Sequence, residues 1–244
     1  MIGNCLEDNS LWYAYKNEVW NQKTPEADVV HNAMRVLRSI TNFNGLAYVS
    51  VPITSGRLLY ERLLKHQVSD KPSKEFMQEI IEDNYSQGYK FVKSLASRLK
   101  IPIVFPADMV PVRQEWEQSH FQALWLSIIA EKCTEVHMSP GWEFSNGASE
   151  EFTHTMQLSL GLPKGKLFFY NTKGDEKIER ERMKSIKVFD ARGNSLSLED
   201  GLGLIEASSD CLKRHGLGEH TKKLDRCIDL LNWTKDKVRE GFYQ

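Results

Sequence analysis

Short apolar runs alternate along the chain with longer stretches in which apolar residues recur every three or four positions. Continuous apolar runs bounded by turn residues are typical of strands covered on both faces. The strands predicted in this way are Leu46–Val51, Ile101–Phe105, Glu135–Met138 and Lys166–Tyr170. The intervening stretches predict helices at Leu58–Leu64, Ser73–Leu99, Arg113–Glu131 and Gly147–Leu160. Strands that alternate with helices predict an α/β fold with a mainly parallel sheet.

The longest helical stretch, Ser73–Leu99, shows which side chains should face the core. Its apolar residues with helical spacing are Phe76, Ile80, Ile81, Tyr85, Tyr89, Val92 and Leu95. We expect these side chains to form the buried face of that helix.

The two ends of the chain differ in character from this middle part. Residues 1–45 predict a helical lead, with a helix starting near Pro25 because proline suits the first helical position. Residues 172–185 are dense in charge, and Ile186–Leu198 resembles a small hairpin or a strand and a turn. Two helices are expected at about 198–215 and 219–241. The predicted parts are therefore a lead (1–45), an α/β domain (46–171) and a charged connector with a helical C-terminal extension (172–244).

The last predicted helix carries an apolar stripe near one face. Its members are Leu224, Ile228, Leu231 and Val238. Such a stripe packs either against the rest of the domain or against a second copy of the chain. Both a monomer and a homo-oligomer are compatible with the pattern.

Composition narrows the class of partner. The formal net charge is −1, so no overall field favours nucleic acid or an anionic membrane. No apolar run is long enough to span a bilayer, and the first eight residues lack the pattern of a signal peptide. The four cysteines are dispersed without CxxC spacing, which predicts free thiols in a reducing cytoplasm. Phosphate-loop, dinucleotide and HExxH motifs are missing, so we expect neither a cofactor nor a metal.

Three loops should meet at one edge of the predicted sheet. Ligands of open parallel sheets bind beyond the carboxyl ends of the strands. The loops that follow these ends are Ser50–Arg57, Pro106–Asp108 and Ser139–Gly147. The first loop has hydroxyls, a glycine and a guanidinium, which could hold a phosphate or a ribose, although an ordinary strand-to-helix turn looks the same. In the third loop, Trp142 could stack on a base or could simply be buried.

Three carboxylates lie in or just after the third loop, at Glu143, Glu150 and Glu151. The last two fall in the first turn of a predicted helix, where the helix dipole favours negative charge in any case. Neighbouring helical residues point about 100° apart. We therefore expect only one of Glu150 and Glu151 to face the sheet edge and the other to be solvated.

Several segments, taken in order, resemble the nucleoside 2-deoxyribosyltransferase-like superfamily. Within it, the chain is most similar to a branch that starts with Y-[IV]-[SA]-G-P-[IM]-[TS] and has a P-G-W-E-x-S-x-G-A-x-x-E core. The resemblance covers roughly residues 46–170. The matching segments are Tyr48–Thr54, Val104–Ala107, Pro140–Glu151 and Leu160–Pro163.

This resemblance implies a flavodoxin-like three-layer sandwich and cleavage of the N-glycosidic bond of a nucleoside or nucleoside monophosphate. The nucleophile of the family is a Glu six residues after a Ser, which corresponds to Glu151 after Ser145. The resemblance thus implies that Glu151 faces the sheet edge, which leaves Glu150 as the solvated carboxylate. A second acid would protonate the leaving base, and Asp108 and Glu143 are both candidates. The implied substrate-binding residues are Tyr48, Ser50, Pro52, Thr54, Ser55, Gly56, Arg57, Trp142, Ser145, Asn146 and Gly147.

Two departures from the family pattern keep other functions open. Val51 stands where the family usually has Gly, and Ala123–Leu126 offers no carboxylate where many members have an Asp. The leading hypothesis is an enzyme that transfers the sugar to water or to another base. The alternatives are a nucleotide-binding sensor without turnover and an NAD-consuming effector.

Overall fold

The computed structural model describes residues 33–34, 45–66, 72–108, 118–161, 169–170, 177–178 and 185–240. The predicted N-terminal lead and most of the charged connector lie outside these residues. Ala33 and Met34 are helical, and the Met34 side chain is completely buried in the main core. Cys133, Cys211 and Cys227 are free thiols. No helix in the described part of the chain is long and apolar enough to cross a membrane.

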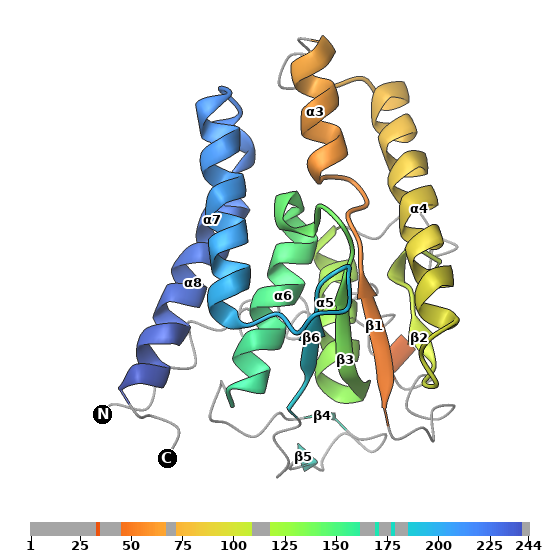
Figure 1. Ribbon diagram of the computed structural model, residues 1–244, viewed down its shortest axis with the longest axis vertical. Helices are drawn as coiled ribbons and strands as arrows, with labels where there is room; N and C mark the ends of the chain where they lie inside the picture. Colours follow the sequence, from red (N-terminus) through yellow and green to blue (C-terminus); the bar gives the residue numbers. More distant parts are fainter. Residues whose placement is uncertain are drawn as a thin grey trace.

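A four-stranded, all-parallel sheet forms the centre of the molecule (Figure 1). Its strands stand in the order β2-β1-β3-β6. They are β1 (Leu46–Ser50), β2 (Ile103–Val104), β3 (Cys133–Met138) and β6 (Lys187–Phe189). Placing the first strand between the second and the third is the flavodoxin-like order. The predicted α/β fold with a parallel sheet is confirmed.

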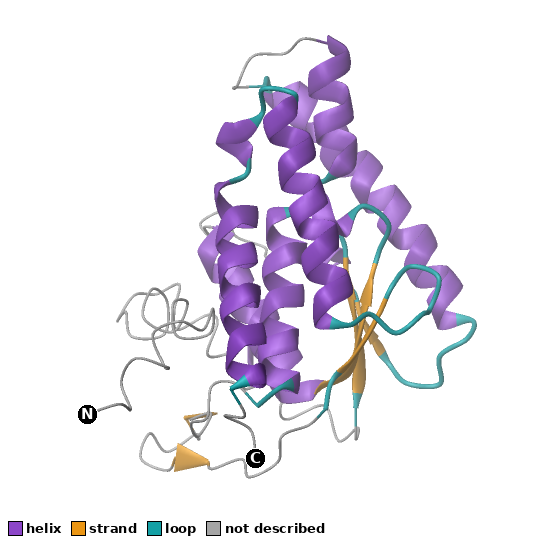
Figure 2. Cartoon of the chain, turned by 60° about the vertical axis from the view of Figure 1, so that its left-hand side comes forward, coloured by secondary structure: helices purple, strands orange, loops and turns teal. Residues whose placement is uncertain are grey.

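Helices cover both faces of the sheet, which completes a flavodoxin-like three-layer sandwich (Figure 2). On one face, α4 (Lys74–Ala96) packs its Leu95 against Val49, Val51 and Phe105. On the other face lie α5 (Gln118–Lys132) and α6 (Asn146–Ser159), which enclose the main core. Each parallel crossover thus buries one face of the sheet under a helix.

Three further helices stand outside this sandwich. The first, α3 (Arg57–His66), follows β1 directly, whereas α7 (Leu198–Arg214) and α8 (Lys222–Arg239) pack on each other and on α6. Short 3₁₀ turns η2 (Pro106–Asp108), η3 (Trp142–Phe144) and η4 (Gly218–His220) link these elements. The two C-terminal helices were predicted close to their observed bounds.

The fourth strand of the sheet is not the one that the sequence predicts. Of the apolar run Lys166–Tyr170, the structure describes Phe169–Tyr170, which form β4 and pair antiparallel with β5 (Lys177–Ile178) in a separate sheet. The parallel sheet instead takes β6, whose Val188 is buried beside β3. An apolar run shows that a segment is β-prone but not which strand it joins, so the sheet extends beyond residue 171.

The buried face of α4 also differs from the prediction. Tyr85 and Tyr89 are 38% and 41% exposed, whereas the fully covered stripe contains Asn84 and Gly88. A Cβ atom on Gly88 would lie 3.1 Å from Val51 and 3.2 Å from Phe105. Because the helix approaches the sheet so closely, a glycine and an amide occupy positions that hydropathy would assign to solvent.

Candidate functional site

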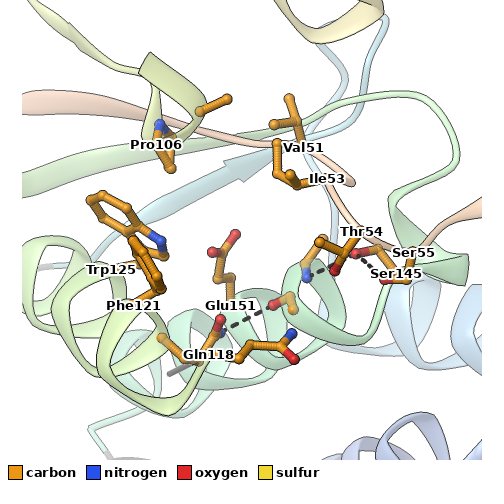
Figure 3. A pocket seen from close by; sticks show the side chains of 14 residues that line it. Val51, Ile53, Thr54, Ser55, Pro106, Gln118, Phe121, Trp125, Ser145 and Glu151 are labelled. Atoms are coloured by element: carbon orange, nitrogen blue, oxygen red, sulfur yellow. Dashed lines mark hydrogen bonds between the residues drawn. The ribbon is translucent and has the colours of Figure 1, made fainter. Parts of the chain in front are cut away.

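A cavity of about 380 Å³ lies at the carboxyl edge of the sheet (Figure 3). All three predicted loops contribute to it, with Val51–Ser55 after β1, Pro106 and Ala107 after β2, and Ser145 after β3. The loops meet because β1 and β3 end side by side, where the Ser139 amide donates to the Ser50 carbonyl oxygen at 3.0 Å. The opposite wall comes from α5 and the first turns of α6.

Glu151 is the carboxylate of this cavity, and two hydroxyls of β1 hold it. The Tyr48 hydroxyl donates to its Oε1 at 2.7 Å, and the Ser50 hydroxyl donates to its Oε2 at 2.5 Å. Residues two apart on a strand face the same side, so β1 presents both donors together. With its side chain only 6% exposed, Glu151 is fixed in orientation while it still reaches the cavity.

Burial raises the pKa of Glu151 to about 7. The hydrogen bonds from Ser50 and Tyr48 act in the opposite direction because they favour the charged form, and the charge of nearby Glu150 raises the pKa further. Burial and the neighbouring Glu151 hold the pKa of the Tyr48 phenol well above its usual range. Tyr48 therefore stays a neutral donor, while Glu151 changes charge near neutral pH.

One end of the cavity is polar, at the N-terminus of α6. Ser145 caps this helix, accepting from the Ala148 amide at 3.4 Å. The Ser55 hydroxyl lies 3.2 Å from that of Ser145 and accepts from the Asn146 amide at 3.3 Å. Hydroxyls at a helix N-terminus, with Gly147 in the first turn beside them, suit an anion or a sugar hydroxyl.

The other end of the cavity is aromatic, and the sequence analysis did not anticipate it. Phe121 and Trp125 of α5 line it, with ring centroids 6.4 Å apart and ring planes 29° apart. Figure 3 shows the two rings on the side of Glu151 away from Ser55 and Ser145. Gln118 lies below them, and the Gln122 amide donates to the Gly147 carbonyl oxygen at 3.2 Å, which ties α5 to α6. Phe121 and Trp125 are four residues apart, and this helical spacing was the sequence signal that could have indicated the aromatic pair.

The loop after β1 is held by a residue that the sequence analysis missed. The buried Asn84 side chain of α4 donates to the carbonyl oxygens of Ile53 and Ser55 at 2.9 and 3.2 Å. Gly56 adopts a φ of +110°, and a Cβ there would lie 2.6 Å from the buried Pro52. These contacts fix the loop that carries Ser55 into the cavity.

Two expected substrate contacts, Trp142 and Arg57, lie elsewhere. Trp142 is 3% exposed and packs in the core with its ring centroid 4.8 Å from that of Phe152. Arg57 is exposed and pairs with Glu61 at 2.6 Å, on the first turn of α3. Thr54 does line the cavity, with its side chain exposed. The aromatic ring beside the carboxylate is therefore Trp125 and not Trp142.

The two candidate proton donors do not line the cavity either. Asp108 is exposed and accepts a hydrogen bond from the Tyr85 hydroxyl at 2.8 Å. Glu143 lies in η3, where burial raises its pKa while its backbone hydrogen bond and the charge of Arg57 lower it. Among the described lining residues, Glu151 is the single ionisable group.

Glu150 was expected in solvent, and that prediction is wrong. Its side chain is 1% exposed and turns towards α8, where Lys223 Nζ lies 3.6 Å from its Oε2. The prediction considered only the dipole of the helix that carries Glu150. In the structure, α8 covers this side of α6 and buries the side chain. Two consecutive carboxylates of α6 are thus both buried, one on each side of the helix.

The cavity as a whole is polarised. Its aromatic end suits a flat ring, its polar end suits an anion, and a buried carboxylate stands between them. Among the residues that the structure describes, no three His, Cys, Asp or Glu side chains form a group that could hold a metal ion. Comparisons with protein-family models, with curated proteins and with solved structures gave no significant match.

Proposed function

We propose that the protein is an N-glycosidase that cleaves the base–sugar bond of a nucleoside or nucleoside monophosphate, with Glu151 as nucleophile. The observation that carries this proposal is the position of the Glu151 carboxylate, held by Tyr48 and Ser50 between an aromatic wall and a helix N-terminus. The resemblance of residues 46–170 to the nucleoside 2-deoxyribosyltransferase-like superfamily supports the same chemistry.

The order of groups along the cavity matches the order of groups in a nucleotide. The base would stack against Trp125 and Phe121, since aromatic side chains bind bases of any sequence through their faces. A 5′-phosphate would bind at the N-terminus of α6, near Ser55 and Ser145. The sugar joins these two parts, so its anomeric carbon would fall opposite Glu151 (Figure 3).

The reaction would proceed in two displacements, as in retaining glycosidases. The ionised Glu151 attacks the anomeric carbon, the carbon–nitrogen bond breaks, and its electron pair leaves with the base, which takes a proton from water. Water, or the nitrogen of a second base, then attacks the same carbon, the carbon–oxygen bond to Glu151 breaks to restore the carboxylate, and the attacking group gives its proton to the solvent. Tyr48 and Ser50 keep the carboxylate oriented through both steps.

A panel of nucleosides, nucleoside 5′-monophosphates and NAD tests the proposal, with released base quantified by chromatography. The expected result is release from at least one substrate by the wild type and loss of at least about a thousandfold in Glu151→Gln. Glu143→Gln is the matched control, because Glu143 does not line the cavity. Failure to release base from every substrate, or equal rates in Glu151→Gln and wild type, would overturn the proposal.

One observation favours a second candidate function. Among the described lining residues no acid besides Glu151 is available to protonate a departing base. A nucleotide sensor needs no such acid, and it would bind an intact nucleotide and return it unchanged after long incubation. A substrate such as NAD needs none either, because its nicotinamide leaves as a neutral molecule. Loss of NAD in cells that express the wild type, but not in those that express Glu151→Gln, would identify that activity.

A further inference from the structure

Two consecutive buried carboxylates lie in the second turn of α6, and of the two only Glu151 lines the cavity. Glu151 is 6% exposed and faces β1, whereas Glu150 is 1% exposed and faces α8. Like charges close together disfavour each other, and burial strengthens the effect because little water screens them. The charge on Glu150 therefore bears directly on Glu151.

A cation from α8 reaches Glu150 from the surface. Lys223 Nζ lies 3.6 Å from Glu150 Oε2, and the Lys223 side chain is 41% exposed. The helix that carries it is firmly docked, since Leu224 and Leu231 are completely buried and Gln157 of α6 donates to Thr234 at 3.3 Å. The lysine is thus held beside the carboxylate by the packing of α8 on α6 (Figure 1).

Two further titratable groups of α8, Cys227 and Arg226, lie near Glu150 or Lys223. Cys227 of α8 is buried, and burial, followed by the charge of Glu150, raises the pKa of its thiol to about 12. It stays neutral at ordinary pH. Arg226 and Lys223 both act on that thiol, but of these two cations it is Lys223 that lies within ion-pair distance of Glu150.

We infer that Glu150 and Lys223 are positioning residues, through which α8 controls the charge state of Glu151 from the far side of α6. The inference rests on the proposed role of Glu151 as nucleophile. With Lys223 in place, the negative charge of Glu150 is offset, and the Glu151 carboxylate remains able to ionise. The C-terminal helices then serve the site as well as the fold.

Opposite changes are expected from removing the two partners. Glu150→Gln removes a negative charge, so Glu151 should ionise at lower pH than in the wild type. Lys223→Met removes a positive charge beside Glu150, so Glu151 should ionise at higher pH. A purely structural pair would lower thermal stability in both variants without moving the ionisation of Glu151 in opposite directions.

The test is a ¹³C NMR titration of the glutamate side-chain carboxyls of the full chain, with the Glu151 signal assigned by its loss in Glu151→Gln. We expect midpoint shifts of at least about half a pH unit, downward in Glu150→Gln and upward in Lys223→Met. Lys223→Arg should keep the wild-type midpoint. Lys222→Met is the matched control, because Lys222 is 77% exposed and pairs with Glu219 at the surface.

The titration needs no turnover, so it separates this inference from the proposed function. An active enzyme whose Glu151 midpoint stays fixed in both variants overturns the inference. Opposite shifts support the coupling, and if they occur in a protein that releases no base, it is the proposed nucleophile that fails. Should Glu150→Gln not fold, Lys223→Met alone decides, since that side chain is half exposed and its loss leaves no buried void.

Discussion

The Tyr48 hydroxyl lies 2.7 Å from Oε1 of Glu151, although 103 positions separate the two residues in the chain. Tyr48 points from the middle of β1, and Glu151 points from the second turn of α6. The parallel pairing of β1 with β3 brings them together, because α6 begins where β3 ends. A strand and a helix N-terminus thus build the centre of the site from opposite sides.

Replacing Tyr48 by Phe should move the pH dependence of activity to higher pH. Catalysis requires the ionised carboxylate, so kcat/KM should rise with pH through about 7 and level off above it. The Tyr48 hydrogen bond lowers the pKa of Glu151, and its loss should raise it. We expect roughly a tenfold loss of kcat/KM at pH 7 and a smaller loss at pH 9.

Profiles of kcat/KM between pH 5 and 9 measure this effect. Tyr60→Phe is the control, since Tyr60 is a buried tyrosine that packs against Phe144 and His220. It should leave the profile unchanged. A Tyr48→Phe profile that superimposes on the wild type would show that the hydrogen bond does not tune Glu151.

Glu151→Gln should be more stable than the wild type at pH 8. Burial raises the pKa of Glu151 to about 7, above its unfolded value, so the folded state binds the proton more tightly. The contribution of the protonated Glu151 carboxyl to the free energy of unfolding is fully present below about pH 4.5 and is lost as the pH rises through 7. The loss amounts to about 3 kcal/mol for a pKa raised by two to three units.

Urea unfolding at pH 5, 6 and 8 tests this pH dependence. The stability difference between Glu151→Gln and the wild type should be small at pH 5 and should grow towards about 3 kcal/mol in favour of the variant at pH 8. Such a gain on removal of a site residue is the usual signature of a buried functional charge. A stability difference between Glu151→Gln and the wild type that does not change with pH would contradict the proposal that burial disfavours the charged form of Glu151.

The sequence predicts the α/β class and the three strand-end loops, because these depend on local patterns and on the shared edge of parallel strands. The choice of Glu151 over Glu150 came from the family resemblance, which places a Glu six residues after Ser145. The same resemblance includes Trp142 among the substrate-binding residues. In the structure, Gly141 adopts a positive φ just before Trp142, and the Trp142 ring packs in the core against Phe152. The aromatic wall comes from α5, a helix apolar on nearly all sides, so no amphipathic pattern marks Trp125 as a lining residue. Long-range packing decided these positions.

Trp125 and Trp142 should respond differently to the same substitution. Trp125→Leu removes a cavity wall and should weaken nucleotide binding by about 1–3 kcal/mol, the usual contribution of one stacked base. Both tryptophans are buried in the main core, so both substitutions should lower the melting temperature. Trp142 does not line the cavity, so Trp142→Leu should leave the affinity per folded molecule close to wild type. Calorimetry measures the nucleotide affinity of both variants, and thermal unfolding measures their melting temperatures. A loss of affinity in Trp142→Leu but not in Trp125→Leu would mean that Trp142, and not Trp125, contacts the nucleotide.

Asn84→Ala should loosen the loop after β1. Its amide holds the carbonyl oxygens of Ile53 and Ser55, and leaving them unpaired should cost about 1–3 kcal/mol of stability. Because Ser55 then loses its fixed position, nucleotide affinity should fall as well. Gln78→Ala, at an exposed position of the same helix, is the control and should change neither quantity. Thermal unfolding and equilibrium binding measure both, and unchanged affinity would mean that the loop holds its shape without Asn84.

Two glycines of α7 should respond to alanine in opposite directions. At Gly201, an added Cβ would overlap the ring of Phe152 of α6, which is completely buried. The residue after Glu151 would then have to move, so Gly201→Ala should cost about 1–3 kcal/mol in stability. At Gly203, no atom lies within 4 Å of an added Cβ, and Gly203→Ala should stabilise the helix by about 0.5–1 kcal/mol.

The Gly201 and Gly203 variants have a functional readout as well. Phe152 is next to Glu151 on α6, so a shift of its ring should displace the carboxylate from Tyr48 and Ser50. We expect Gly201→Ala to lose base-releasing activity beyond its loss of folded protein, whereas Gly203→Ala should keep wild-type activity. Urea unfolding with activity per folded molecule separates the two effects. Equal stability of both variants would mean that α7 can move away from α6 at no cost in free energy. The close packing of these two helices would then have no part in positioning Glu151.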